Sequence, residues 1–160
     1  MEITQPTTAA VEPLVDCWME LAADQQQYGS RLSTESNRQA VSETIARHIV
    51  TDGLLVAREG EAIRGFVMYH VEDGRYQQAE TTGVVVTLYV RPDFRDDGIG
   101  SELLAAAEAE LAADGVDTVT LEVLAANDDA RRFYSRQGYR THRLELAKRI
   151  ENDTHSKDEG

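Results

Sequence analysis

The sequence predicts an α/β (α+β) domain in which helices flank a mixed, mostly antiparallel central sheet. Apolar residues recur at helical spacing at the start of the chain, then alternate or run together as β-branched stretches, and later return to helical spacing. The middle stretches are joined by short links, which favour antiparallel neighbours, whereas a later strand–helix–strand order requires a parallel pair. We therefore expect one sheet that changes from antiparallel to parallel near its last strands.

The first part of the chain predicts a short edge strand and two amphipathic helices. Residues 3–5 form the candidate strand, and apolar residues at three- and four-residue steps predict helices over about 8–24 and 35–50. The polar residues 25–34 lie between the helices and predict a loop. Asp52-Gly53 marks the end of the second helix.

Three strands follow, over residues 54–58, 63–71 and 81–90. Turn residues separate them, namely Glu59-Gly60-Glu61 and Glu72-Asp73-Gly74. These three strands predict an antiparallel meander.

A helix and a parallel strand come next. Residues 98–114 predict a helix with one apolar face, and Gly115 stands where a capping glycine belongs. Residues 117–124 alternate as a strand that pairs in parallel with 81–90.

The last part of the chain predicts a short helix and a final strand. Asn127 is suited to the helix N-cap, with acidic residues in the first turn, and Gly138 ends the helix. Residues 139–146 predict the strand. We expect a single domain over residues 1–147 and a polar, disordered tail over 148–160.

A glycine-containing stretch between a strand and a helix carries the first chemical signal, Arg95-Asp96-Asp97-Gly98-Ile99-Gly100. A helix N-terminus leaves backbone N–H groups unpaired, and glycines let the main chain approach an anion closely. The stretch therefore predicts a site for a diphosphate, although a tight turn alone would also need these glycines. No Lys-Ser/Thr pair follows, which excludes a P-loop, and a third glycine for the dinucleotide fingerprint is absent.

A second motif strengthens this interpretation, Asn127-x-x-Ala130-x-x-Phe133-Tyr134-x-x-x-Gly138-Tyr139. Together with the glycine loop it resembles the GNAT superfamily of N-acetyltransferases, whose loop reads Q/R-x-x-G-x-G/A and whose later helix often reads N-x-x-A-x-x-F/L-Y-x-x-x-G-F/Y. The resemblance covers about residues 54–146. It implies the GNAT fold, in which the parallel strand pair splays apart.

The resemblance implies an enzyme that transfers an acetyl group from acetyl-CoA, without a metal, to a primary amine by direct attack. Tyr134 would act as the general acid that protonates the departing thiolate of coenzyme A. Asn127 and Tyr134 would also contact the cofactor. Backbone amides of the loop would bind the pyrophosphate, from Arg95, Asp96, Asp97, Gly98, Ile99, Gly100 and Ser101. The main chain of the preceding strand would lie along the pantetheine arm, at Leu88, Tyr89 and Val90.

The general base is less clear from the sequence. Glu122 lies in Leu121-Glu122-Val123, which resembles the L-E-V of family members that acetylate protein N-termini. A solvent-facing or substrate-binding carboxylate is an equally good interpretation of Glu122. Other family members carry a glutamate where this chain has Val84, so Glu80, His70 or water stay open as alternatives.

Charge limits the partners. The net charge of −13 disfavours nucleic acid and anionic membranes, which require basic patches, and favours a cationic small-molecule or peptide amine. The acidic, lysine-poor composition fits a protein adapted to high salt, as in a halophile, and salt would screen Asp96 and Asp97 beside a diphosphate. The chain has neither a signal-peptide pattern nor a long apolar run, so we expect a cytoplasmic location.

Two further questions stay open. In the superfamily the acceptor pocket is usually shaped by the first two helices, here with Trp18 and Tyr28, and homodimers are common, but the sequence shows no interface. The alternative function is a non-catalytic acyl-CoA-binding or regulatory module of the same fold.

Overall fold

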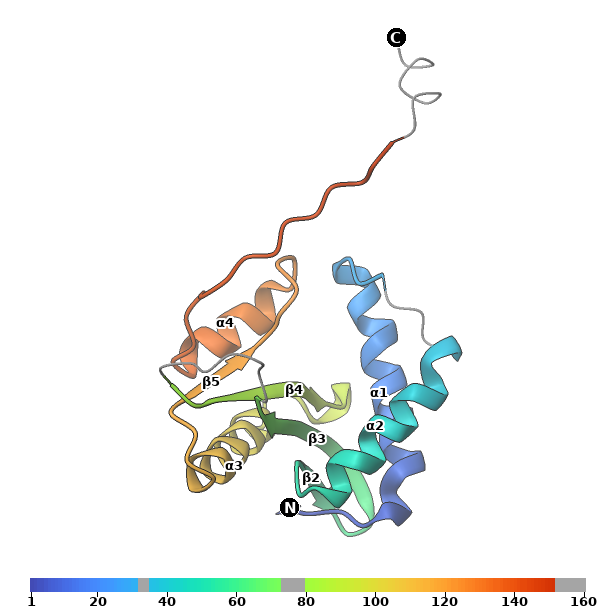
Figure 1. Ribbon diagram of the computed structural model, residues 1–160. Coiled ribbons are helices and arrows are strands. Elements are labelled where there is room, and N and C mark those ends of the chain that lie inside the picture. The colour runs from blue at the N-terminus through green and yellow to red at the C-terminus, as the bar shows by residue number, and fades with distance from the viewer. Residues whose placement is uncertain (32–34, 73–79, 152–160) are drawn as a thin grey trace.

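The computed structural model describes residues 1–31, 35–72 and 80–151. Its centre is a sheet with strand order β1-β2-β3-β4-β5 (Figure 1). The strands are β1 (Glu2–Thr4), β2 (Leu54–Glu59), β3 (Ala62–Val71), β4 (Thr82–Val90) and β5 (Thr118–Leu121). All neighbours are antiparallel except β4 and β5, which are parallel, as the strand–helix–strand order predicted.

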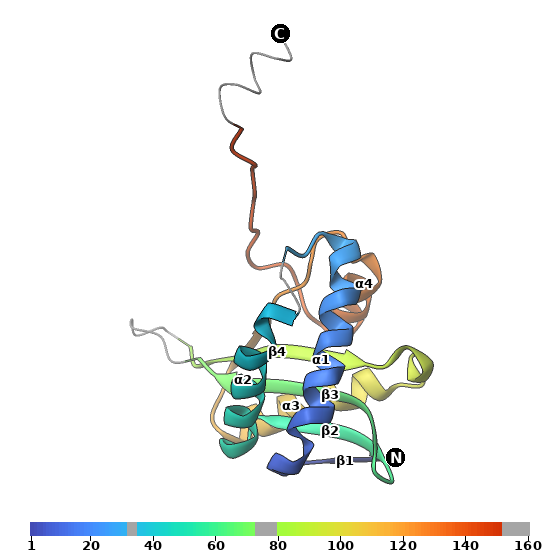
Figure 2. The ribbon, with the colours of Figure 1, turned by 90° about the vertical axis from the view of Figure 1, so that its right-hand side faces the viewer.

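Helices cover both faces of the sheet. Helices α1 (Val11–Gln25) and α2 (Arg38–Val50) lie side by side on one face, as Figure 2 shows, and α3 (Ile99–Ala113) lies on the other. Helix α4 (Asp128–Arg136) follows β5. Four short 3₁₀ turns complete the described elements, at Thr8–Ala10, Gln26–Tyr28, Glu35–Asn37 and Pro92–Phe94.

Two apolar cores lie on the two sides of the sheet. In β2, Leu54 and Val56 join the cluster beneath α1 and α2, while Leu55 and Ala57 join the cluster beneath α3. Because successive side chains of a strand point to opposite faces, a strand covered on both faces is apolar at every position. This explains the continuous hydrophobic runs in the middle of the sequence.

The parallel pair is joined over only part of its length. Pairing runs from Thr82 opposite Thr118 to Val85 opposite Leu121, and β4 then continues to Val90 paired with β3 but not with β5. At the same level the β3–β4 register shifts, so that Met68 pairs with Thr87 and Tyr69 pairs with Val85. Val86 is therefore the extra residue of a β-bulge, which bends a strand and increases its twist. The splayed pair expected from the resemblance thus begins at this bulge.

Two sequence predictions need correction. Residues 139–146 form no strand: beyond Tyr139 the described chain is exposed and extends away from the body (Figure 1). The apolar alternation is present, but a strand needs a neighbour to pair with, and this segment pairs with none of the residues that the structure describes. β5 is also shorter than the predicted 117–124, because its partner strand diverges after Val85. The predicted turn at 72–74 falls largely outside the described residues.

Candidate active site

The gap between β4 and β5 is the first part of the site. From Thr87 to Val90 the edge of β4 that faces β5 has no strand partner among the described residues, so its backbone polar groups are available to an extended ligand. Leu88 and Val90 are half-buried and turn toward the α3 side, whereas Tyr89 is buried on the α1 side. The predicted residues Leu88, Tyr89 and Val90 therefore line the splayed part of the strand.

The N-terminus of α3 lies directly beyond the end of β4. Among the described residues no acceptor is found for the backbone N–H groups of residues 96–101, and no side chain caps the helix. The N–H of Arg95, in contrast, already donates to the carbonyl of Pro92 at 3.4 Å. A row of free N–H groups at the positive end of a helix suits an anion, and in this structure that row consists of residues 96–101.

Backbone shape explains the residue types in this loop. Gly98 has φ +82 and Asp96 has φ +69, both in the left-handed region. Aspartate is among the few residues other than glycine that enter this region readily. Asp96 and Asp97 are exposed and make no described polar contact with another side chain, so their charges remain uncompensated near the free N–H groups.

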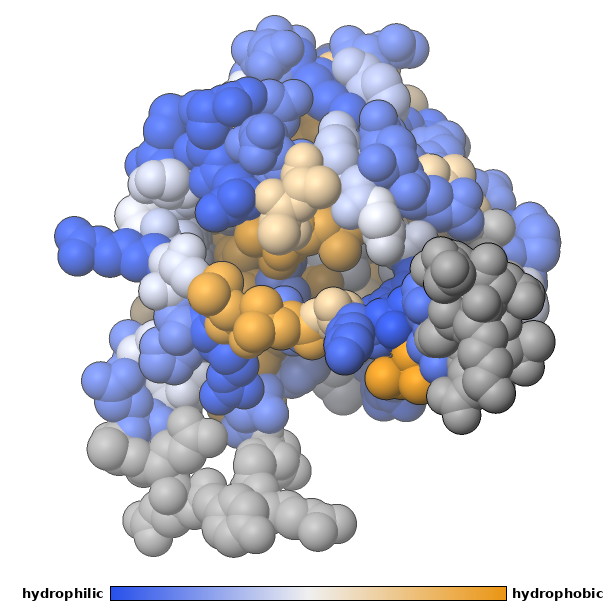
Figure 3. Space-filling view, turned by 90° about the horizontal axis from the view of Figure 1, so that it is seen from above, coloured by the Kyte–Doolittle hydropathy of each residue, from blue (hydrophilic) through white to orange (hydrophobic). Residues whose placement is uncertain are grey.

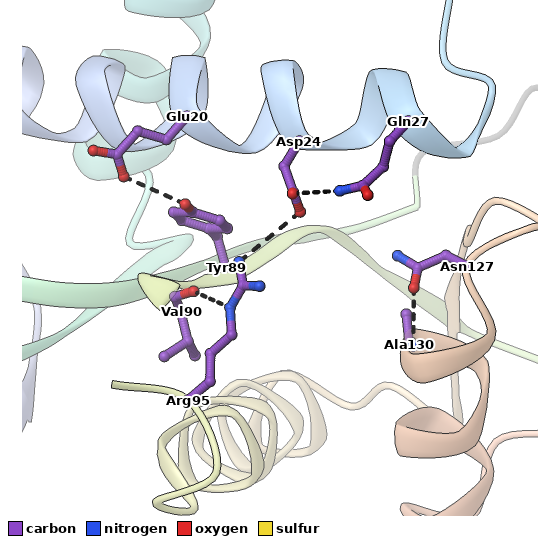
Figure 4. Close-up of polar contacts among 8 residues, drawn as sticks. All are labelled: Glu20, Asp24, Gln27, Tyr89, Val90, Arg95, Asn127 and Ala130. Carbon is purple, nitrogen blue, oxygen red and sulfur yellow. Dashed lines mark hydrogen bonds and ion pairs between the residues drawn. The ribbon is translucent and has the colours of Figure 1, made fainter. Parts of the chain in front are cut away.

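The side chain of Arg95 turns away from the free N–H groups and toward α1 (Figure 4). Its Nε donates to the carbonyl oxygen of Val90 at 3.0 Å, and its Nη2 lies 3.9 Å from a carboxylate oxygen of Asp24. On the same side of β4 the hydroxyl of Tyr89 donates to Glu20 at 3.3 Å. These contacts tie the end of α1 to the glycine loop, and they give the Arg95 side chain a structural role.

Helix α4 packs against the start of α3, which joins the two sequence motifs. A Cβ at Gly100 would lie 3.4 Å from the ring of Phe133, at ordinary van der Waals distance, so Phe133 of α4 packs directly against the first turn of α3. The amide of Gln137 donates to the hydroxyl of Ser101 at 3.0 Å. Asn127 caps α4 by accepting from the Ala130 N–H at 3.1 Å, as predicted, and is buried across the gap from β4 (Figure 4).

Tyr134 is half-buried on α4 and packs with the same apolar cluster as Leu88 and Val90. Its ring lies edge-on to Phe133, with centroids 5.1 Å apart, and to Tyr139 at 5.9 Å. Burial raises the pKa of Tyr134 to about 12, so the phenol keeps its proton throughout the neutral range. Its hydroxyl makes no described hydrogen bond within the chain, unlike that of Tyr139, which donates to Glu108 at 2.6 Å. The arrangement suits a proton donor.

The candidate bases occupy different places. Glu122 is exposed and follows the last paired residue of β5, where the gap opens. Glu80 accepts from the hydroxyl of Thr118 at 2.6 Å, at the opposite end of β4 from the glycine loop. His70 is opposite Val84 in the paired part of the sheet and lies 3.2 Å from Nε2 of His48 on α2. Of the three, Glu122 alone lies at the splay.

Two cavities adjoin β4 on its α1 side. One of about 280 Å³ lies over the bulge and is apolar in character. Trp18 lines it, as expected, but Tyr28 does not. A second of about 700 Å³ lies between α1 and the turn after β4. Their main lining residues are Trp18, Thr44, Met68, Val86 and Thr87 for the first, and Glu20, Asp24, Tyr89, Arg91 and Asp93 for the second.

The sequence did not reveal some of these features. The bulge at Val86 has no signature in the run of β-branched residues, and the contacts of Glu20 and Asp24 connect positions far apart in the chain. Among the described residues, no group of three or more His, Cys, Asp or Glu is placed to hold a metal ion. No described helix has the length and apolar character needed to cross a membrane.

Comparison with known proteins identifies relatives of the chain. Residues 16–139 match the model of the acetyltransferase (GNAT) family. The aminoalkylphosphonate N-acetyltransferase of Salmonella typhimurium is 30% identical over 122 residues, which are 74% of this chain and 78% of that protein.

Solved structures share the fold. A mutant of the BH1408 protein from Bacillus halodurans superposes with a TM-score of 0.78 at 21% identity, covering 94% of this chain and 99% of that chain. The PaiA N-acetyltransferase of Thermoplasma acidophilum, solved in complex with coenzyme A, gives a TM-score of 0.72 at 19% identity over 90% and 92% of the two chains.

Replacement of Asn127 by alanine tests the cap of α4. We expect Asn127→Ala to lower the free energy of unfolding by about 1 kcal/mol, because the Ala130 N–H loses its acceptor at a buried position. Asn127→Ser, which can still cap, should recover most of that loss. Urea unfolding followed by circular dichroism measures both. Equal loss in the two variants would contradict a capping role.

Proposed function

The chain belongs to the acetyltransferase (GNAT) family, and from that premise we propose that it transfers an acetyl group from acetyl-CoA to a primary amine of a small molecule or peptide. The observation that carries the proposal is the meeting of two features at one end of the sheet. The unpaired edge of β4 leads directly to the free N–H groups of residues 96–101. Such a combination suits an extended, amide-containing arm that ends in a diphosphate.

Acetyl-CoA would supply the activated thioester. On the protein side, the main chain at Leu88 and Val90 would orient the arm, and the N–H groups of residues 96–101 would bind the pyrophosphate. Tyr134 would donate its phenolic proton to the thiolate sulfur as it leaves. A phenol is protonated at neutral pH whether or not its pKa is raised, so the support for this role is the position of Tyr134 in the apolar cluster that also holds Leu88 and Val90.

The amine must lose a proton before or during attack on the thioester carbonyl. We propose Glu122 as the group that receives it, directly or through water, because it stands where β5 separates from β4. Glu80 is already hydrogen-bonded to Thr118, and His70 is already hydrogen-bonded to His48. These contacts favour Glu122 over either of them as the base.

The acceptor would enter from the α1 and α2 side. The cavity of about 280 Å³ lies over the bulge at Val86 and holds Trp18 and Thr87, so it would accommodate an apolar part of a small amine. The name of the Salmonella relative, an aminoalkylphosphonate N-acetyltransferase, also supports a small primary amine. The acidic surface would attract a cationic acceptor.

Thiol release from acetyl-CoA in the presence of a panel of primary amines tests the proposal. Turnover with at least one amine is expected. Tight binding of acetyl-CoA in calorimetry without thiol release from any amine would instead favour the alternative, a non-catalytic acyl-CoA-binding module.

Replacement of Tyr134 by phenylalanine tests the proton donor. We expect turnover to fall by about 100-fold or more while the affinity for acetyl-CoA changes little, because the ring remains and only the acidic proton is lost. Tyr139→Phe is the matched control, since its hydroxyl bonds to Glu108 on α3. Equal loss of turnover in the two variants would argue against the assignment.

Replacement of Glu122 by glutamine tests the base. Without a base only the neutral fraction of the amine reacts, and this fraction grows about tenfold per pH unit until the amine's own pKa, about 10 for an alkylamine. The defect of Glu122→Gln should therefore be large near pH 7 and shrink as the pH rises. Glu80→Gln serves as the control and should resemble the wild type at every pH. A defect of constant size from pH 7 to 10 would contradict the role.

Neutralising Asp96 and Asp97 tests the effect of charge at the cradle. We expect Asp96→Asn with Asp97→Asn to bind acetyl-CoA about tenfold more tightly at low salt, and the gain to disappear in molar salt because screening removes the repulsion. Asparagine tolerates the positive φ of residue 96, so the backbone is left unchanged. Titration calorimetry at both salt concentrations measures the effect, and an unchanged affinity at low salt would refute it.

A further inference from the structure

The segment after α4 is the largest feature that the proposed function does not use. Residues 140–151, which we call the arm, leave the body beyond Tyr139 and point away from it in both ribbon views (Figures 1 and 2). Tyr139 itself is fixed to the body, since its N–H donates to the carbonyl of Tyr134 and its hydroxyl donates to Glu108. Within the described chain no hydrogen bond or ion pair involves any residue of the arm.

The arm nevertheless carries the pattern of a half-buried strand. In a regular strand Leu144, Leu146 and Ile150 would share one side, together with Lys148, and the three aliphatic side chains are 75%, 91% and 84% exposed. The opposite side carries Arg143 and Glu145. Figure 3 views the molecule from the side to which the arm projects and shows a band of apolar side chains on an otherwise largely hydrophilic face. Three large aliphatic side chains exposed in series are unfavourable in water unless another surface covers them.

The sheet has a free edge at which such a strand could pair. β5 is the last strand in the sheet order, so one of its edges carries unpaired backbone N–H and C=O groups. Its residues Thr118–Leu121 are only half-buried, and Val123 beyond them is exposed. Helix α4, next to this edge, contains no buried residue. Among the described residues the outer edge of β5 thus has no strand partner, and the arm has the residue pattern of a strand but no sheet to pair with.

Charge favours a contact between the arm and the acidic body of the protein. The arm holds four basic residues (Arg140, Arg143, Lys148 and Arg149) and two acidic ones, a net charge of +2, which leaves −15 for the rest of the chain to make the total of −13. Asp117 and Glu122 flank β5. A basic strand that meets an acidic edge gains electrostatic complementarity.

We propose that the arm of one chain adds as a strand to the free edge of β5 in a second copy, and that the second copy returns its own arm in the same way. An extended segment of twelve residues reaches about 40 Å, which is more than the four residues of β5 require and enough to cross to a partner. Exchange of identical segments makes a closed two-fold dimer in which both free edges are paired. The apolar side of each arm is covered in the partner.

Sedimentation of the full chain at micromolar concentration tests the proposal. A dimer is expected. Leu144→Asp with Leu146→Asp should raise the dimer dissociation constant by about 100-fold or more, because two buried leucines are lost, while the circular dichroism of the body stays the same. Glu145→Gln, on the opposite side of the arm, is the matched control and should remain dimeric. A wild-type monomer, or a double variant that dimerises like the control, would overturn the proposal.

Cross-linking of the unaltered protein distinguishes exchange from folding of the arm onto its own β5. Lys148 is one of only two lysines in the chain, so a zero-length amine-to-carboxylate reagent acts at few places. Nitrogen-15-labelled and unlabelled chains are unfolded together, refolded and treated. Peptides that join Lys148 to Asp117 or Glu122 and carry one label of each kind are expected. If every such peptide carries a single isotope, the arm binds its own chain and the exchange is excluded. This result is independent of catalysis.

Discussion

The early end of the parallel ladder between β4 and β5 is the constraint on which the rest of the site depends. Pairing stops at Val85 and Leu121, and the bulge at Val86 turns the remainder of β4 away from its neighbour. Had the ladder continued, the edge of β4 would be filled with backbone hydrogen bonds and closed to any ligand. The free edge exists because both faces of β4 are held by packed cores, under α1 and under α3, so the strand stays extended without its neighbour.

The helices that border the gap supply its functional groups. The N-terminus of α3 presents free N–H groups at one end of the gap, and α4 places Tyr134 on the same side of the sheet as Leu88 and Val90. Small contacts set this spacing, notably the close approach of Gly100 to Phe133 and the bond between Gln137 and Ser101. The glycines of the loop leave the main chain uncovered beside these free N–H groups, an arrangement that suits an anion.

Charge is distributed unevenly over the molecule. Around the end of β4, Glu20 and Asp24 of α1 are matched by Tyr89, Arg91 and Arg95, so acidic groups near the loop are partly engaged. Asp96 and Asp97 are not. The arm carries a net positive charge, opposite in sign to the rest of the chain.

The sequence by itself determined the element types, the change from antiparallel to parallel pairing, the cap at Asn127 and the glycine loop, because each depends on local spacing and on residue types with strong backbone preferences. Only the tertiary structure decided where the ladder ends, which way the Arg95 side chain turns, and that Glu122 rather than Glu80 lies at the splay. It also decided that residues 139–146, despite a strand pattern, form no strand within their own chain. These outcomes depend on which distant segments meet. Alternation of apolar and polar residues indicates that one face of a strand will be buried, but it does not indicate which segment will cover that face.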